Sequence, residues 1–326
     1  MRFFIRRIFI WISIFGLCMA GFLSPAIAVE SRDAKARALA HYTMGLIHDW
    51  NGSVDEAIEE YQKSIRIEQD NYATHLKLGS NYGRVGDFEK AVKELEIASD
   101  LNPKDIQAHY LLALIYSSQS KEVQATNEYE IILTRIAEEN PESPEAIAFL
   151  GQLYYSEGKT KKAIEQFEKI ILIEPNNAEI LSILGSLYLE VQQRKKAIDF
   201  FKRAIAIDPI HDGSLNSLGY LYAEDGINID EAIDLIQRAL TVDPENGAYL
   251  DSLGWAYYKK GDYEKALLFL ERAAKFIEDP VIYDHIGDVY LKMNKPKSAV
   301  RFWQKSVDML PDQKEVLKKI QKIQSH

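Results

Sequence analysis

Cysteine is almost absent from this chain: among 326 residues, Cys18 is the only one. A single cysteine excludes an intrachain disulfide, and it excludes a zinc site built on several thiolates. The fold must therefore be held together by apolar packing. The composition allows this, because 47% of the residues are hydrophobic and 27% are charged, as in an ordinary folded chain.

Basic residues are also in deficit, with 39 Lys and Arg against 49 Asp and Glu, which gives a formal charge of −10. Three of the basic residues (Arg2, Arg6 and Arg7) lie at the extreme N-terminus, so the remainder is more acidic still. Such a body argues against binding to nucleic acid, where Lys and Arg must neutralise phosphates, and against docking on an anionic membrane surface. A neutral or basic protein partner fits the charge better.

Recognisable catalytic motifs are missing as well. The sequence contains no phosphate-binding glycine-rich loop, no HExxH and no GxSxG, so we expect no catalytic residues, no cofactor and no enzymatic activity. One acidic pair, Asp284 and Asp288, has the i, i+4 spacing that places two carboxylates on one helix face, with His285 between them. A hard cation usually needs about six oxygen ligands, so we expect no metal there, and a metal- or ligand-binding role remains a lesser alternative.

The N-terminus has the features of a secretory signal peptide over residues 1–28. Its arginines are followed by an apolar stretch from Ile8 to Leu23, a helix-breaking Ser24-Pro25 and an A-x-A site ending at Ala28. The sequence therefore predicts export to a bacterial periplasm or outer envelope, with cleavage after Ala28 and a linker over residues 29–37. An uncleaved membrane anchor is the alternative. Lipidation of Cys18 is disfavoured, because Leu17 precedes it where a small residue is needed.

Internal periodicity is the main feature of the rest of the chain. Alanines recur at intervals of 33 to 38 residues, at Ala57, Ala91, Ala125, Ala163, Ala197, Ala232, Ala266 and Ala299. A small residue, usually glycine, precedes each by 12 or 13 positions, an aromatic usually follows that small residue by three, and a large apolar residue follows each alanine by four. This L-G-x-x-Y … A-x-x-x-F pattern resembles the tetratricopeptide repeat.

The resemblance implies an all-α fold: a right-handed superhelical solenoid of about eight helix-turn-helix repeats over residues 38–311. The apolar spacing agrees, because each repeat has two stripes of helical period that only stacked neighbours can bury. Single turn glycines are available for a positive φ, and Ser143-Pro144 and Asp279-Pro280 provide helix N-caps. Residues 312–326 predict a capping helix that packs through Val316, Leu317, Ile320 and Ile323 and exposes Lys314, Lys318, Lys319 and Lys322.

In proteins of this repeat family, the first helix of each repeat lines the concave groove. With the small residue taken as position eight, positions 2, 5, 9 and 12 are expected to face inward. Rings beside amides and carboxylates suit a peptide ligand, and they occur at these positions in repeats six to eight. The predicted partner-binding residues are Asn216, Tyr220, Asp251, Trp255, Tyr258, Asp284 and Asp288. The competing structural interpretation is that Tyr220 and Trp255 pack against adjacent repeats.

Residues 212–311 also resemble bacterial envelope proteins with this repeat, including adaptors that bring processing proteases to their substrates. The chain lacks the lipid-attachment signal common among those adaptors. We therefore expect a non-catalytic scaffold or adaptor of the cell envelope that binds a protein or peptide, such as an envelope protease or assembly complex. The alternative is a membrane-anchored assembly factor for exopolysaccharide, pilus or secretion machinery, in contact with the membrane only through residues 1–28.

Overall fold

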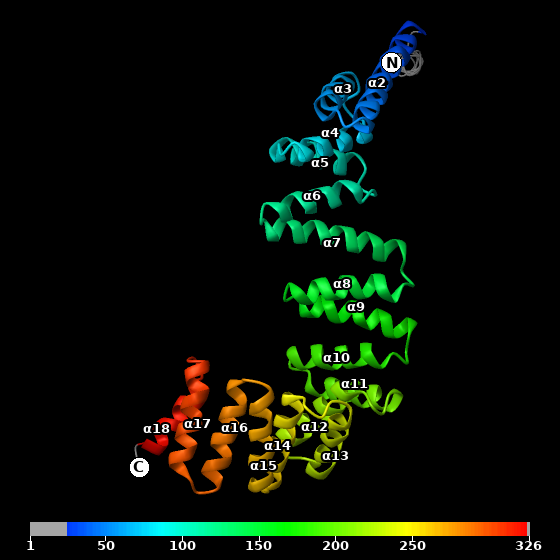
Figure 1. The fold of residues 1–326 in the computed structure, drawn as a ribbon. Helices are drawn as coiled ribbons and strands as arrows, with labels where there is room; N and C mark the ends of the chain where they lie inside the picture. Colours follow the sequence, from blue (N-terminus) through cyan, green and yellow to red (C-terminus); the bar gives the residue numbers. More distant parts are fainter. Residues whose placement is uncertain (1–24, 325–326) are drawn as a thin grey trace, which may run out of the picture. The chain divides into compact units, whose positions relative to one another are not determined.

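The computed structural model describes residues 25–324, and every regular element in that range is an α-helix (Figure 1). Most of the predicted signal peptide, residues 1–24, lies outside the described range. Residues 29–37, predicted as a linker, lie inside the first described helix, which begins at Pro25. Among the described residues, no helix is both long and apolar enough to cross a membrane.

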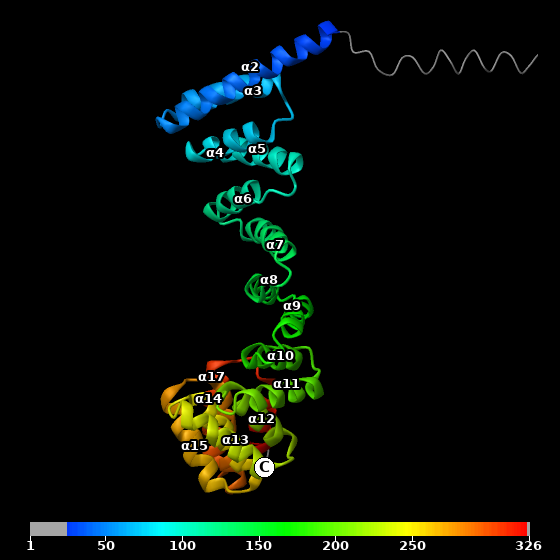
Figure 2. The same cartoon turned by 90° about the vertical axis from the view of Figure 1, so that its right-hand side faces the viewer.

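The chain divides into two compact units, Met1–Glu139 and Asn140–His326. The described part of the first unit holds three antiparallel helix pairs, which correspond to repeats one to three (Figure 2). Its helices are α2 (Pro25–Trp50), α3 (Val54–Ile67), α4 (Tyr72–Arg84), α5 (Phe88–Leu101), α6 (Gln107–Ser118) and α7 (Glu122–Glu139). Repeat three is longer than the others, because the interval from Ala125 to Ala163 is 38 residues. The additional residues lengthen α7 to 18 residues, whereas the other second helices have 14.

The second unit holds repeats four to eight and a final helix. Its helices are α8 (Pro144–Ser156), α9 (Thr160–Ile173), α10 (Ala178–Glu190), α11 (Arg194–Ile207), α12 (Asp212–Asp225), α13 (Ile229–Val242), α14 (Gly247–Lys260), α15 (Tyr263–Phe276), α16 (Pro280–Lys292), α17 (Pro296–Met309) and α18 (Lys314–Gln324). The predicted all-α helical repeat fold is confirmed, with sixteen repeat helices from α2 to α17.

Local chemistry sets the ends of these helices. The Ser143 side chain accepts a hydrogen bond from the Ala146 amide at the start of α8, and Asp279 accepts one from Val281 at the start of α16. Five turn glycines have positive φ, and Ser120, Gln192 and Asn294 take this conformation in the repeats without one. The predicted turn chemistry is therefore confirmed, and it extends to non-glycine residues at the same turn.

The packing within each repeat depends on the small residue at position eight. A Cβ placed on Gly185 of α10 would lie 2.5 Å from the Phe201 ring of α11, and one on Gly79 of α4 would lie 2.7 Å from Leu95 Cγ of α5. Both large partners are fully buried. Two helix backbones can approach this closely only because the glycine has no side chain. The spacing from glycine to alanine that recurs from repeat to repeat is therefore a packing requirement.

Helix α18 packs as predicted through one face but differs on the other. Val316 and Ile320 are buried against Trp303, and Leu317 and Ile323 pack beside them. Lys319, however, does not simply face water. Its ammonium lies 2.7 Å from Asp284 and 2.8 Å from Asp288. This contact arises because α18 packs after the last repeat as another first helix would, which places Lys319 against α16, the first helix of that repeat.

Candidate functional site

Among the described residues, three hollows that border the first helices of the repeats occur at the same register. Each is bordered by positions 2, 5 or 9 of adjacent first helices, the positions expected to face inward. One lies in the first unit, has a volume of about 380 Å³, and is lined by Leu76, Lys77, Ser80, Ile106, Gln107, Tyr110, Leu111 and Ile132. The other two lie in the second unit.

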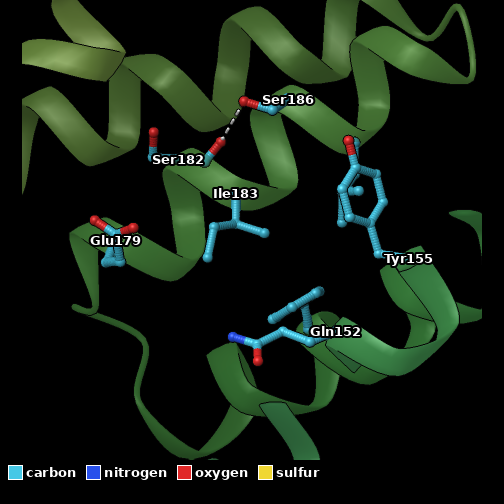
Figure 3. A pocket seen from close by; sticks show the side chains of 8 residues that line it. Gln152, Tyr155, Glu179, Ser182, Ile183 and Ser186 are labelled. Carbon is cyan, nitrogen blue, oxygen red and sulfur yellow. Dashed lines mark hydrogen bonds between the residues drawn. The ribbon is translucent and has the colours of Figure 1, made fainter. Parts of the chain in front are cut away.

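The hollow between α8 and α10 has a volume of about 370 Å³. Gln152 and Tyr155 lie on the α8 side, opposite Ser182 and Ser186 on α10 (Figure 3). Its lining residues are Gln152, Tyr155, Phe167, Glu179, Ser182, Ile183, Ser186 and Leu187. This hollow combines an exposed ring with small hydroxyls and an amide, groups that can contact both the side chains and the backbone of a bound segment. The residue types at these positions are not distinctive, although the register places them on the inward-facing side.

The third hollow, between α12, α14 and the start of α16, has a volume of about 310 Å³. Its lining residues are Asn216, Tyr220, Ala248, Asp251, Ser252, Ile277, Asp279, Val281 and Ile282. We call it the acidic pocket. Three of the seven predicted partner-binding residues, Asn216, Tyr220 and Asp251, line it, and burial raises the pKa of Tyr220 to about 12 with help from Glu224 and Asp251.

Two further predicted residues form an aromatic stack beside this pocket. The Trp255 ring lies between Tyr258 and His285, with ring centroids 4.7 and 4.1 Å away and nearly parallel planes. His285 Nδ1 in turn lies 2.9 Å from Asp251 Oδ1. Trp255 is therefore held by packing between α14 and α16. Burial raises the pKa of the Tyr258 phenol to about 12, and the negative charge of Asp288 adds to the rise.

The remaining predicted pair, Asp284 and Asp288, is occupied by a side chain of the protein itself. Lys319 Nζ donates to both carboxylates, and the Trp303 indole donates to Asp288 Oδ1 at 3.1 Å. Burial raises the pKa of Asp288, while Lys319 opposes the rise. Across residues 25–324 no three His, Cys, Asp or Glu side chains gather to hold a metal ion, and an ammonium already lies where a cation would bind this pair.

The first unit contains a series of histidine–glutamate contacts that was not predicted from the sequence. His41, His75 and His109 lie one repeat apart, and each contacts a glutamate 19 residues later at 2.7 Å. The glutamates are Glu60, Glu94 and Glu128, which lie three residues after the repeat alanines. The sequence contains a pattern that could have predicted this series, because each histidine lies four residues before the small residue of its repeat.

The surroundings of His75 favour the charged imidazolium form. Its Nδ1 faces Glu94, and its Nε2 faces the Gln69 carbonyl at 2.7 Å; both partners are acceptors, so both ring nitrogens must carry hydrogens. Burial opposes the charged form, but the hydrogen bonds to Glu94 and Gln69 and the charges of Glu94 and Asp70 outweigh it, so the pKa of His75 is raised.

A raised pKa predicts a pH-dependent contribution to stability. The contribution of His75 is full below the unfolded-state pKa of about 6.5 and is lost as pH rises through the higher folded-state pKa. We expect His75→Gln to cost about 2 kcal/mol at pH 6 and progressively less at higher pH. Urea unfolding of the wild type and the variant from pH 6 to 9 measures this, and Glu94→Gln should flatten the profile in the same way. A deficit independent of pH would contradict the assignment of charge.

Comparisons with known proteins agree with the repeat pattern. The chain matches family models described as tetratricopeptide repeat over residues 51–115 and 217–280, and one described as anaphase-promoting complex, cyclosome, subunit 3 over residues 122–204. The crystal structure of the APC/C hetero-tetramer Cut9-Hcn1 aligns with a TM-score of 0.55 at 17% identity, over 83% of this chain and 52% of that one. At this identity the likeness concerns the fold alone.

Several curated relatives match parts of the chain, among them the following two. Photosystem I assembly protein Ycf3 of Cyanophora paradoxa is 32% identical over 97 residues, which cover 29% of this chain and 56% of Ycf3. BBSome complex member BBS4 of Bos taurus is 28% identical over 159 residues, which cover 49% of this chain and 28% of BBS4. The matches therefore span less than two thirds of each relative.

Proposed function

Because the chain is a tetratricopeptide repeat protein, we propose that it is a non-catalytic scaffold that binds an extended segment of a partner protein along the first helices of its second unit. Repeat solenoids characteristically bind other proteins over the extended surface of their stacked helices. The relatives Ycf3 and BBS4 carry names that place them in assembly or in a complex, which supports the same class of role.

The recurrence of hollows at one register is the observation that carries the proposal. Two of them lie in the second unit, one beside Tyr155 and the other beside Tyr220, two repeats further along. An extended segment presents side chains at regular intervals, and hollows at regular intervals can accept some of them. At the hollows themselves, polar groups such as Ser182 and Asn216 can form hydrogen bonds with the backbone of the segment.

Photo-crosslinking tests which face binds. With a photo-reactive phenylalanine analogue in place of Ser182 on α10, we expect ultraviolet light to join the purified scaffold covalently to its partner in cell-envelope extract. The matched control places the same analogue at Leu172 on α9, a second helix, where the native side chain is 83% exposed. Equal crosslinking at both positions, or crosslinking only at Leu172, would show that the groove is not the binding surface.

We further propose that the scaffold works in a bacterial cell envelope, as an adaptor for an envelope protease or an assembly complex. The arginines, apolar stretch and A-x-A site of residues 1–28 support this location. N-terminal sequencing of the native protein should read from Val29. An intact residue 1–28 segment would instead favour the membrane-anchored assembly factor, and recovery of the protein in the cytoplasm would overturn both.

A further inference from the structure

We propose that the acidic pocket binds a lysine or arginine side chain of the partner segment. This inference rests on the proposed function and names the chemistry that the partner must carry. The pocket is lined by two carboxylates, Asp251 and Asp279, and by the apolar side chains of Ile277, Val281 and Ile282. A cationic group on an aliphatic stem matches both parts, because the stem can lie along the apolar wall while the charge reaches the carboxylates.

Among the described residues, no lysine or arginine pairs with the carboxylates of the pocket. Within residues 25–324, neither Asp251 nor Asp279 forms a salt bridge with a lysine or arginine. Asp251 receives one contact, from His285 Nδ1, and Asp279 accepts from the Val281 amide at 2.7 Å. The nearby Arg194 is committed to Glu224 and Asp225. An incoming cation would therefore meet two carboxylates without displacing an internal ammonium.

One repeat further along, the protein shows the same recognition within itself. Positions 5 and 9 of α16 are Asp284 and Asp288, and Lys319 fills the space between them while its ammonium lies 5.8 Å from the Trp303 ring centroid. Position 5 of α14 is Asp251, also acidic, but the α16 residue that faces it is His285 rather than a lysine. An acidic residue at position 5 can therefore bind an ammonium or guanidinium group. At Asp251 the described part of the protein provides no such group, and a lysine or arginine of the partner can provide it.

The residue at position 9 differs between the acidic pocket, which no lysine of the described range occupies, and the Asp284–Asp288 pair, which Lys319 occupies. Tyr220 of α12 and Trp255 of α14 stand at the position that Asp288 takes in α16. Trp255 is stacked on His285, which lies behind Asp251, so the carboxylate is backed by flat rings and opens toward Asn216 and Tyr220. A long side chain can enter there, and its stem can lie beside the Tyr220 ring.

Affinity selection with short synthetic peptides tests the inference. The probes are capped peptide libraries whose central residue is fixed as arginine, lysine, citrulline, norleucine or glutamate; citrulline and norleucine are the neutral counterparts of the two bases. We expect the purified protein to retain the arginine and lysine libraries about tenfold better than the neutral ones, as for a hydrogen bond to a charged group. The preference should weaken as salt is raised.

Matched variants locate the effect. Asp251→Asn and Asp279→Asn should each reduce the charge preference; asparagine is as good an N-cap as aspartate, so the second variant keeps α16 intact even if the first disturbs His285. Asp234→Asn, an equal change of charge on α13 where the side chain is 70% exposed, should leave the preference unchanged. Equal loss in all three variants would overturn the pocket assignment.

The outcomes separate this inference from the proposed function. If peptides bind without preference for a basic residue while crosslinking at Ser182 persists, the cation pocket is overturned and the scaffold stands. If no library is retained but Ser182 still crosslinks to a partner, the cation pocket is overturned as well. If neither peptides nor a partner engage the groove, both proposals fail together.

Discussion

Replacing Gly79 with alanine is expected to lower the free energy of unfolding of the first unit by about 2 kcal/mol, the cost of overfilling a packed core. The new Cβ would lie 2.7 Å from Leu95 Cγ and 3.1 Å from the Ala91 carbonyl oxygen. A leucine can rotate its methyl groups, but its Cγ and the backbone of α5 cannot move without separating the two helices. Urea unfolding followed by circular dichroism measures the loss.

Gly83, one turn further along the same helix, is the matched control. A Cβ there would lie 3.6 Å from the terminal Cδ1 of Ile115, which is ordinary van der Waals contact. Because alanine is favoured over glycine in a helix, Gly83→Ala should raise stability by up to about 1 kcal/mol. Similar effects of the two substitutions would mean that helix propensity, not the approach of α4 to α5, decides the need for glycine at position eight.

Replacing Lys319 with methionine is expected to destabilise the last repeat and α18 by about 2 kcal/mol or more, because it leaves buried carboxylates without their cation. The Asp288 side chain is only 15% exposed, and Asp284 is 21% exposed. Methionine keeps most of the stem that lies near Trp303, so the loss reports mainly on charge. Urea unfolding gives the magnitude, and amide hydrogen exchange should place the loss in α16, α17 and α18.

Two controls make the Lys319 result specific. Lys318, the preceding residue on α18, has a side chain that is 68% exposed and bonds Glu315 alone, so Lys318→Met should change stability little. Adding Asp288→Asn to Lys319→Met should restore part of the lost stability. Since burial raises the pKa of Asp288, the deficit should also shrink as pH falls and this carboxyl is protonated. A deficit unchanged by pH and by Asp288→Asn would contradict the electrostatic explanation.

Much of the fold could be predicted from the sequence because repeats make one pattern visible many times. The spacing from Gly185 to Ala197 and Phe201 specifies two helices and the point where they cross, and the structure buries Phe201 there completely. Side-chain contacts between repeats were harder to predict. Asp284 and Asp288 were predicted as groove residues, yet Lys319, more than 30 positions later, binds them.

The candidate site shows the same division. The register predicted which positions face inward; Asn216, Tyr220 and Asp251 line a hollow, whereas Asp284 and Asp288 are bound by Lys319. Residue type did not single out Tyr155 and Ser182, which border another hollow, since neither residue type is distinctive alone. Trp255 was predicted to contact a partner, but its ring is stacked between Tyr258 and His285. A sequence gives the direction of a side chain, whereas its neighbours decide how much of it remains available.

The sequence by itself determined the helices, their pairing and the phase of each repeat, because helix periodicity, caps and turn residues act over a few neighbouring positions. Only the tertiary structure decided which charges are already paired and which hollows are open. Those properties depend on side chains that helix packing brings together from positions 19 to 37 residues apart, within one repeat for His75 with Glu94 and between repeats for Tyr249 with Asp212. The strength of such contacts depends on burial, and a repeat becomes fully buried only when its neighbours stack on it.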